Sequence, residues 1–65
     1  MEYRWSKRHG ESLDEAIAAS GRNITGFAVE CRVTRGQVHE WIRGARPNKS
    51  NYAAIVRLLP EMAQA

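Results

Sequence analysis

Apolar side chains recur along this chain at intervals of three and four residues, which is the spacing of one face of an α-helix. Three such stripes predict helices over about residues 13–20, 24–31 and 34–43, and a fourth stripe predicts a helix that ends before Pro60. No segment alternates for long enough to predict a β-strand, although the first six residues, MEYRWS, alternate weakly and fit an extended segment. We therefore expect an all-α fold, a compact bundle of four to five short helices that contains a helix-turn-helix.

Polar residues that favour helix ends flank these stripes. Ser12 and Glu15 have the spacing of a capping box, which predicts that the first helix begins at residue 13. Gly21 and Gly44 end the first and third helices, because glycine enters the left-handed conformation at little cost. The residues predicted to cap the later helices are Asn23, Thr34 and, before the fourth helix, either Asn48 or Ser50.

The four stripes are expected to share one hydrophobic core, since helices this short are marginal in isolation. A chain of 65 residues forms one domain at most. We place this domain at residues 12–65, with residues 1–11 as an N-terminal arm or short extension, and expect the tail after Pro60 to form a final turn or to fray. The predicted core residues are Leu13, Ile17, Ile24, Phe27, Ala28, Cys31, Val33, Val38, Trp41, Ile42, Tyr52, Ile55, Val56 and Leu59.

The composition excludes several classes of site. Cys31 is the single cysteine, so neither an internal disulfide nor a cysteine-based zinc site is expected, and a lone thiol suits the cytoplasm. No apolar run approaches the roughly 18 residues of a membrane span, and no signal-peptide pattern follows the N-terminus. His9 and His39 are isolated, and no catalytic set is visible. We expect no enzyme activity, no metal, no cofactor and no small-molecule ligand.

The charge is divided along the chain, and its net value is +3. Residues 32–49 contain five Arg or Lys side chains and one acid, Glu40, whereas Glu11, Asp14 and Glu15 cluster earlier. A surface divided in this way suits a polyanion on its basic side. An ordinary solvated face is the simpler alternative.

The segment from residue 28 to residue 41 predicts two helices that meet at a tight corner. Ala28 is small enough to let the helices touch, and Val33 places an apolar side chain in the turn. Val38 and Trp41 then dock the second helix at a steep angle. This pattern resembles the helix-turn-helix of the phage-repressor family, the lambda-repressor-like or Cro-like domains.

The resemblance covers residues 12–59. Gly21 and Asn23 fall where the family ends its first helix and caps its second, and the segment WIRGARPN, residues 41–48, is similar to the family's link to its fourth helix. The family usually has glycine at the position of Arg32, because the corner calls for a positive φ, and another residue there costs about 1 kcal/mol or more. Either the turn is reshaped so that Arg32 stays right-handed, or the strain is tolerated; a phosphate contact by this side chain is a further alternative.

The resemblance implies that the chain binds double-stranded DNA, with the helix over residues 34–43 in the major groove. Arg35 is the strongest candidate for base recognition, because a guanidinium matches O6 and N7 of guanine, although it can also be a plain surface charge. Gly36 has no side chain and fits a close approach of the backbone to DNA. The candidates for base contacts are Thr34, Arg35, Gly36, Gln37, His39 and Glu40.

Three of these candidates have other interpretations. Gln37 contacts adenine or is merely exposed, and His39 contacts a base, contacts a phosphate or is exposed. Glu40 accepts a hydrogen bond from cytosine, pairs with Arg43 or orients His39. We favour an intramolecular role for Glu40, because DNA phosphates repel a carboxylate.

Contacts to the DNA backbone are expected from helix N-termini and from the basic link, since free N–H groups and cations attract phosphate. The candidates are Asn23, Thr25, Arg43, Arg46, Asn48 and Lys49. The early basic residues Arg4, Lys7 and Arg8 form an arm along the DNA or are disordered.

One recognition helix spans few base pairs, so we expect a homodimer on a palindromic site. Trp5, Leu58 and Met62 are candidates for the dimer contact, unless they pack within their own chain. The predicted function is a sequence-specific transcriptional regulator, a Cro-type repressor of a phage or mobile element. The alternative is a helix-turn-helix protein-interaction module (an antitoxin, antirepressor or assembly factor) that does not recognise DNA, which Glu40 on the groove-facing side favours.

Overall fold

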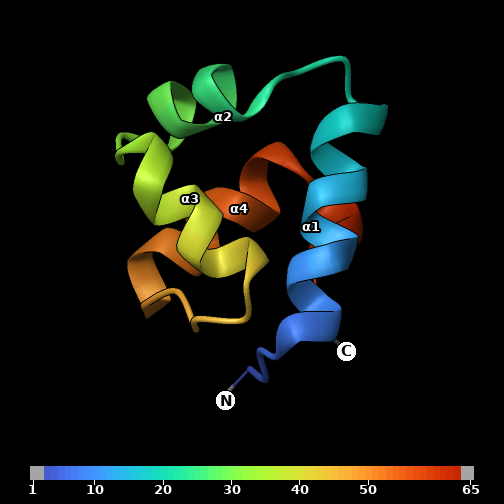
Figure 1. The fold of residues 1–65 in the computed structure, drawn as a ribbon, viewed down its shortest axis with the longest axis vertical. Coiled ribbons are helices and arrows are strands. Elements are labelled where there is room, and N and C mark those ends of the chain that lie inside the picture. The colour runs from blue at the N-terminus through green and yellow to red at the C-terminus, as the bar shows by residue number, and fades with distance from the viewer. Residues whose placement is uncertain (1–2, 64–65) are drawn as a thin grey trace.

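The computed structural model describes residues 3–63, which form an all-helical bundle (Figure 1). Figure 1 shows α1 along one side of the molecule, α2 and α3 on the opposite side, and α4 crossing behind them. No residue within this range lies in a β-strand, so the predicted all-α bundle is confirmed. The elements are α1 (Lys7–Ala19), α2 (Ile24–Cys31), α3 (Arg35–Ile42), α4 (Lys49–Leu58) and the short 3-10 helix η1 (Pro60–Met62).

α1 begins at Lys7, earlier than the sequence pattern predicts. Ser6 is its N-cap, with an extended backbone (φ −144°), and the backbone N–H of Ser6 donates to Nδ1 of His9 at 3.1 Å. The capping box predicted from Ser12 and Glu15 is therefore wrong, because both residues are exposed within a continuous helix. The domain boundary expected between residues 11 and 12 falls inside α1.

The other helix starts follow the predicted caps. The side-chain oxygens of these caps accept backbone N–H groups: Asn23 from Gly26 at 2.7 Å, Thr34 from Gln37 at 3.1 Å and Asn48 from Asn51 at 2.8 Å. Asn48 rather than Ser50 caps α4. Gly21 and Gly44 follow α1 and α3 with φ values of 81° and 112°, which confirms both predicted stops.

The core combines apolar side chains from every helix. Leu13, Phe27, Val38 and Ile55 are fully buried, and Trp41 is 2% exposed. The predicted core residues that are only half-buried are Ile24, Val33, Ile42, Tyr52 and Val56. The buried apolar residues outside the predicted core are Ala16, Pro47 and Met62. The tail after α4 folds back as η1, and this turn brings its methionine into the core.

α1 and α3 approach each other closely at Gly10. A Cβ atom on Gly10 would overlap the carbonyl oxygen of Ile42 and would lie 2.6 Å from that of Trp41. The indole Nε1 of Trp5 donates to the same Trp41 oxygen at 2.9 Å. These contacts hold the C-terminal end of α3 against the first turns of α1, and they set the orientation of α3.

Candidate nucleic-acid interface

α3 is packed on one side and exposed on the other. Val38 and Trp41 are buried, whereas Arg35, Gly36 and Gln37 are all exposed. Because buried side chains fix α3, its exposed first turn has a defined position on the surface. The other predicted base-contact residues are the exposed Thr34 and Glu40 and the half-buried His39.

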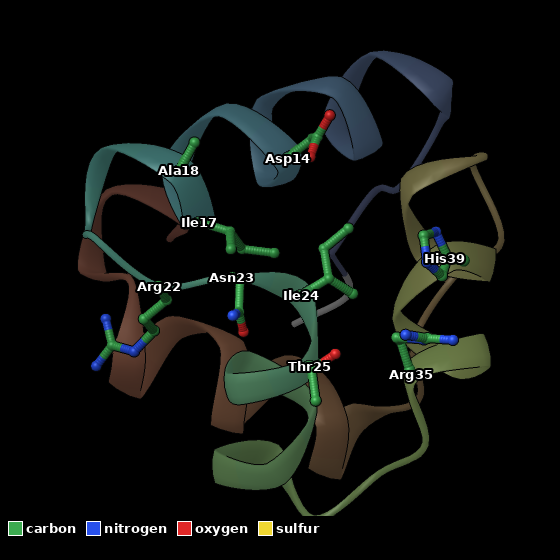
Figure 2. Close-up of a pocket in the computed structure, with 9 residues that line it drawn as sticks. All are labelled: Asp14, Ile17, Ala18, Arg22, Asn23, Ile24, Thr25, Arg35 and His39. Atoms are coloured by element: carbon green, nitrogen blue, oxygen red, sulfur yellow. The ribbon is translucent and has the colours of Figure 1, made fainter.

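A groove of about 460 Å³ lies beside the first turns of α3. Figure 2 shows Arg35 and His39 of α3 on one side of this groove, Asp14 of α1 on another, and Ile24 and Thr25 at the start of α2. The groove therefore joins the starts of α2 and α3 in one concave surface. The predicted DNA-contact residues that line it are Asn23, Thr25, Arg35 and His39.

The three capping residues Asn23, Thr34 and Asn48 are also predicted to contact DNA. Their side-chain oxygens accept backbone N–H groups and are therefore engaged within the protein. The amide N–H groups of the two asparagines and the hydroxyl hydrogen of Thr34 are donors that suit a phosphate oxygen. Each cap also stands at the positive end of a helix dipole.

Glu40 forms an ion pair within α3. Its Oε2 lies 3.0 Å from Nη1 of Arg43, and the two side chains are 58% and 74% exposed. The predicted pairing of Glu40 with Arg43 is therefore confirmed, and its contact with a base stays a prediction. An exposed pair of this kind contributes at most about 1 kcal/mol to stability. Its main effect is to place a positive charge beside the carboxylate on the outward side of α3.

The link between α3 and α4 packs against the N-terminal segment. The Tyr3 hydroxyl donates to the carbonyl oxygen of Pro47, and the Tyr3 ring stacks on Tyr52 with centroids 4.0 Å apart. Cζ of Arg46 lies 4.6 Å from the centroid of the Tyr3 ring. Arg46 and Lys49, both predicted to contact the DNA backbone, are exposed on this link and at the start of α4.

Two of the three early basic residues lie in α1 and not in a separate arm. Lys7 and Arg8 belong to α1, because Ser6 starts the helix immediately before them. Arg4 is exposed in the extended segment that precedes the helix. The prediction of an arm or a disordered segment is therefore wrong for Lys7 and Arg8.

Trp5, Leu58 and Met62, the candidates for a dimer contact, all contact the core of their own chain. Met62 is 6% exposed, and the other two are half-buried. Packing within the chain was the alternative interpretation of these residues. The dimer stays a prediction that depends on the need for two half-sites and not on these side chains.

Arg32 adopts the left-handed conformation at the corner, with φ 61° and ψ 41°. Its N–H donates to the carbonyl oxygen of Val29 at 3.1 Å, and the N–H of Val33 donates to that of Ala28 at 3.0 Å. The corner is thus closed as a glycine would close it. Of the two explanations for a non-glycine residue here, tolerated strain is correct, and a reshaped turn is wrong.

Replacing Arg32 by glycine is expected to raise the melting temperature by about 3–6 °C. The relief of left-handed strain outweighs the added flexibility of the unfolded chain by about 0.5–1 kcal/mol. Thermal unfolding followed by circular dichroism measures the change. Arg32→Ala is the matched control: it removes the side chain, keeps the strain and should give no rise. A lower melting temperature for Arg32→Gly would show that the guanidinium itself stabilises the corner.

A second groove, of about 560 Å³, lies between the end of α2 and α4. Arg32 and Arg57 line it, and it shares no residue with the groove beside α3. The corner arginine therefore contributes to a different surface from Arg35. Arg57, which is exposed, provides a control position for experiments on α3.

Sequence reasoning missed the ion pair between Arg22 and Glu30, in which Nε lies 2.6 Å from Oε2. The hydrogen bond from Arg22 lowers the pKa of the Glu30 carboxyl, and the same bond raises the pKa of Arg22. No helical spacing signals this pair, because Arg22 lies in the loop before α2.

Burial raises the pKa of the Cys31 thiol, so the thiol is neutral and poorly nucleophilic near pH 7.

Comparison with known proteins adds no assignment to this geometry. No protein-family model matches the chain, and no curated protein matches it. Between residues 3 and 63, no three His, Cys, Asp or Glu side chains are grouped to hold a metal ion. None of the helices in this range combines the length and the apolar character of a membrane span.

Proposed function

We propose that this protein is a sequence-specific DNA-binding transcriptional regulator of the helix-turn-helix type, with α3 as its recognition helix. The observation that supports this most strongly is the division of α3 into a side buried through Val38 and Trp41 and an exposed start. An α-helix with side chains is about 10–12 Å across, and the major groove is about 12 Å wide. A helix fixed from behind by its core residues can therefore enter that groove without rearrangement.

The exposed start of α3 supplies the chemistry for base recognition. Arg35 offers a bidentate fork to guanine, and Gln37 offers an amide that matches adenine. Gly36, between them, lets the helix backbone approach the bases. His39 lies in the groove beside α2, where it suits a phosphate contact better than a base contact. Glu40 is paired with Arg43, so its carboxylate repels phosphates less than an isolated charge would.

The surroundings of α3 supply contacts to the DNA backbone. Arg43, Arg46 and Lys49 are exposed at the end of α3, on the link and at the start of α4. The N-termini of α2 and α3, with Asn23, Thr25 and Thr34, add N–H groups and positive dipole ends. These contacts would orient the protein on the duplex without specifying its sequence.

The same proposal includes a cytoplasmic homodimer that binds a palindromic operator, as a Cro-type repressor of a phage or mobile element would. Two copies would double the number of base pairs recognised and match the two-fold symmetry of the site. The dimer contact would use surface other than Met62, which is buried in its own chain.

The alternative is a helix-turn-helix module that binds a protein. Two observations favour it: the carboxylate of Glu40 on the outward side of α3, and Asp14 on the wall of the groove beside it. The ion pair from Arg43 weakens the first of these, because it supplies a compensating charge.

Titration with a fluorescent 20-base-pair duplex of random sequence distinguishes the two functions. Three to four cations on one surface predict a slope of about −2.7 to −3.6 for the logarithm of the affinity against the logarithm of the salt concentration, so affinity should fall about 40- to 150-fold between 50 and 200 mM salt. The protein-interaction module would be favoured if no binding is detected at either salt concentration, or if the affinity does not change with salt concentration.

A further inference from the structure

We propose that Tyr3 positions Arg46 for a contact with the DNA backbone. The N-terminal segment would then act on DNA binding from beneath the link between α3 and α4, and not as an arm along the duplex. This inference rests on the proposed function, which supplies the phosphate. Tyr3 itself would be a positioning residue, because it acts through the arginine.

The segment that holds Tyr3 is fixed at several points. Its hydroxyl donates to the carbonyl oxygen of the buried Pro47, and its ring is parallel to that of Tyr52, with an interplanar angle of 4°. Two residues later, the Trp5 ring is nearly perpendicular to that of Tyr52, with centroids 6.4 Å apart, and its Nε1 donates to the carbonyl oxygen of Trp41. The ring of Tyr3 therefore has a defined position relative to both ends of the link.

Arg46 lies over this fixed ring, with Cζ 4.6 Å from the centroid, which is within the range of a cation–π contact. A guanidinium carries its N–H donors on the edges of a planar group, so a contact with the ring leaves those donors available. Arg46 is exposed, and no hydrogen bond or ion pair joins it to another residue within 3–63. Its charge is thus ordered by the ring and still directed at solvent.

The other cations of this surface lack such a contact. Arg43 is paired with Glu40, which offsets its charge, and among the described residues Lys49 makes no cation–π contact. Arginine loses considerable rotamer freedom when it binds a phosphate, and ordering the side chain beforehand reduces that cost. Arg46 is therefore the cation of the link whose phosphate contact should gain most from a neighbouring side chain.

A double-mutant cycle tests the coupling. The dissociation constants of the full chain and of Tyr3→Leu, Arg46→Ala and the double variant are measured on the random 20-base-pair duplex at 50 mM salt. Tyr3→Leu should weaken binding about 2- to 5-fold, which is the size of an exposed cation–π contact. It should have no further effect when Arg46 is already alanine. Tyr3→Phe keeps the ring and its stacking on Tyr52 but loses the hydrogen bond to Pro47, so it should retain most of the affinity of the parent protein.

Two outcomes of this cycle would overturn the inference. Additive losses in the double variant would show that Tyr3 acts independently of Arg46. Tighter binding by Tyr3→Leu would show that the ring withholds the guanidinium from DNA. Thermal unfolding of each variant is recorded, so that the dissociation constants are compared at a temperature at which Tyr3→Leu, Tyr3→Phe and the parent protein are all folded.

A second readout needs no DNA. In the free protein, the ring current of Tyr3 should shift the Cδ protons of Arg46 upfield in NMR spectra, equally in Tyr3→Phe, and Tyr3→Leu should abolish the shift. An absent shift in the parent protein would overturn this inference alone. A parent protein that shows the shift but binds no duplex would overturn the proposed function, and with it the role of Arg46 in DNA binding.

Discussion

Gly10→Ala is expected to lower the free energy of unfolding by about 3 kcal/mol, which is the upper end of the usual cost of overpacking. The added Cβ would overlap the backbone carbonyl of Ile42, and a backbone atom cannot turn aside as the end of a flexible side chain can. α1 and α3 would have to separate at their closest point. A core of this size supplies only about 3–5 kcal/mol in total, so much of the population should unfold at room temperature.

Urea denaturation followed by circular dichroism measures this change, and Gly36→Ala is the matched control. A Cβ atom at Gly36 would meet only Oγ1 of Thr34, at 3.9 Å, and alanine favours helix by up to about 1 kcal/mol over glycine. The midpoint of Gly36→Ala should therefore stay unchanged or rise. Equal midpoints for the two alanine variants would show that the backbones of α1 and α3 are not in contact at Gly10.

The contrast between α1 and the other helices shows which parts of the fold are visible in the sequence. A local pattern is sufficient to place three of the helix starts, because each cap accepts the backbone N–H of a residue only three positions later. These caps are Asn23, Thr34 and Asn48. The start of α1 was misplaced because Ser12 and Glu15 carry a capping pattern on what proves to be the exposed side of a helix that has already begun.

Contacts between distant segments explain the rest of the difference. Gly10 weakens a helix in isolation, and its role becomes visible only when the carbonyl of Ile42 is placed beside it. The same holds for Tyr3 and Arg46, which are far apart in the sequence and meet only because the link folds over the N-terminal segment. The exposed side of α3 is predictable, because the spacing of Val38 and Trp41 in the sequence is enough to identify the buried side of the helix.

Arg35→Ala is expected to weaken binding to a selected operator about 5- to 150-fold, which corresponds to the roughly 1–3 kcal/mol of a bidentate contact with guanine. The Arg35 side chain is exposed at the start of α3. Its loss would remove a base contact as well as a charge. The cost should therefore exceed that of losing a distant cation.

Arg57→Ala is the matched control for this prediction. It removes the same side chain from an exposed position on α4, beside a groove that shares no residue with the one that Arg35 lines. Its affinity for the operator should stay within about 2-fold of that of the parent protein. The substitution removes only a long-range attraction between Arg57 and DNA, and salt screens this attraction. Equal losses in the two variants would show that Arg35 acts through its charge alone.

Selection of bound sites from a randomised DNA pool, carried out with the parent protein and with Arg35→Ala, tests recognition by α3 most directly. The parent protein should enrich a symmetric sequence whose half-sites lie about 34 Å apart. Arg35→Ala should lose the preference for guanine at one position of each half-site and keep the preferences elsewhere. A parent protein that enriches no sequence, or an Arg35→Ala variant that keeps every preference, would contradict the assignment of α3 as the recognition helix.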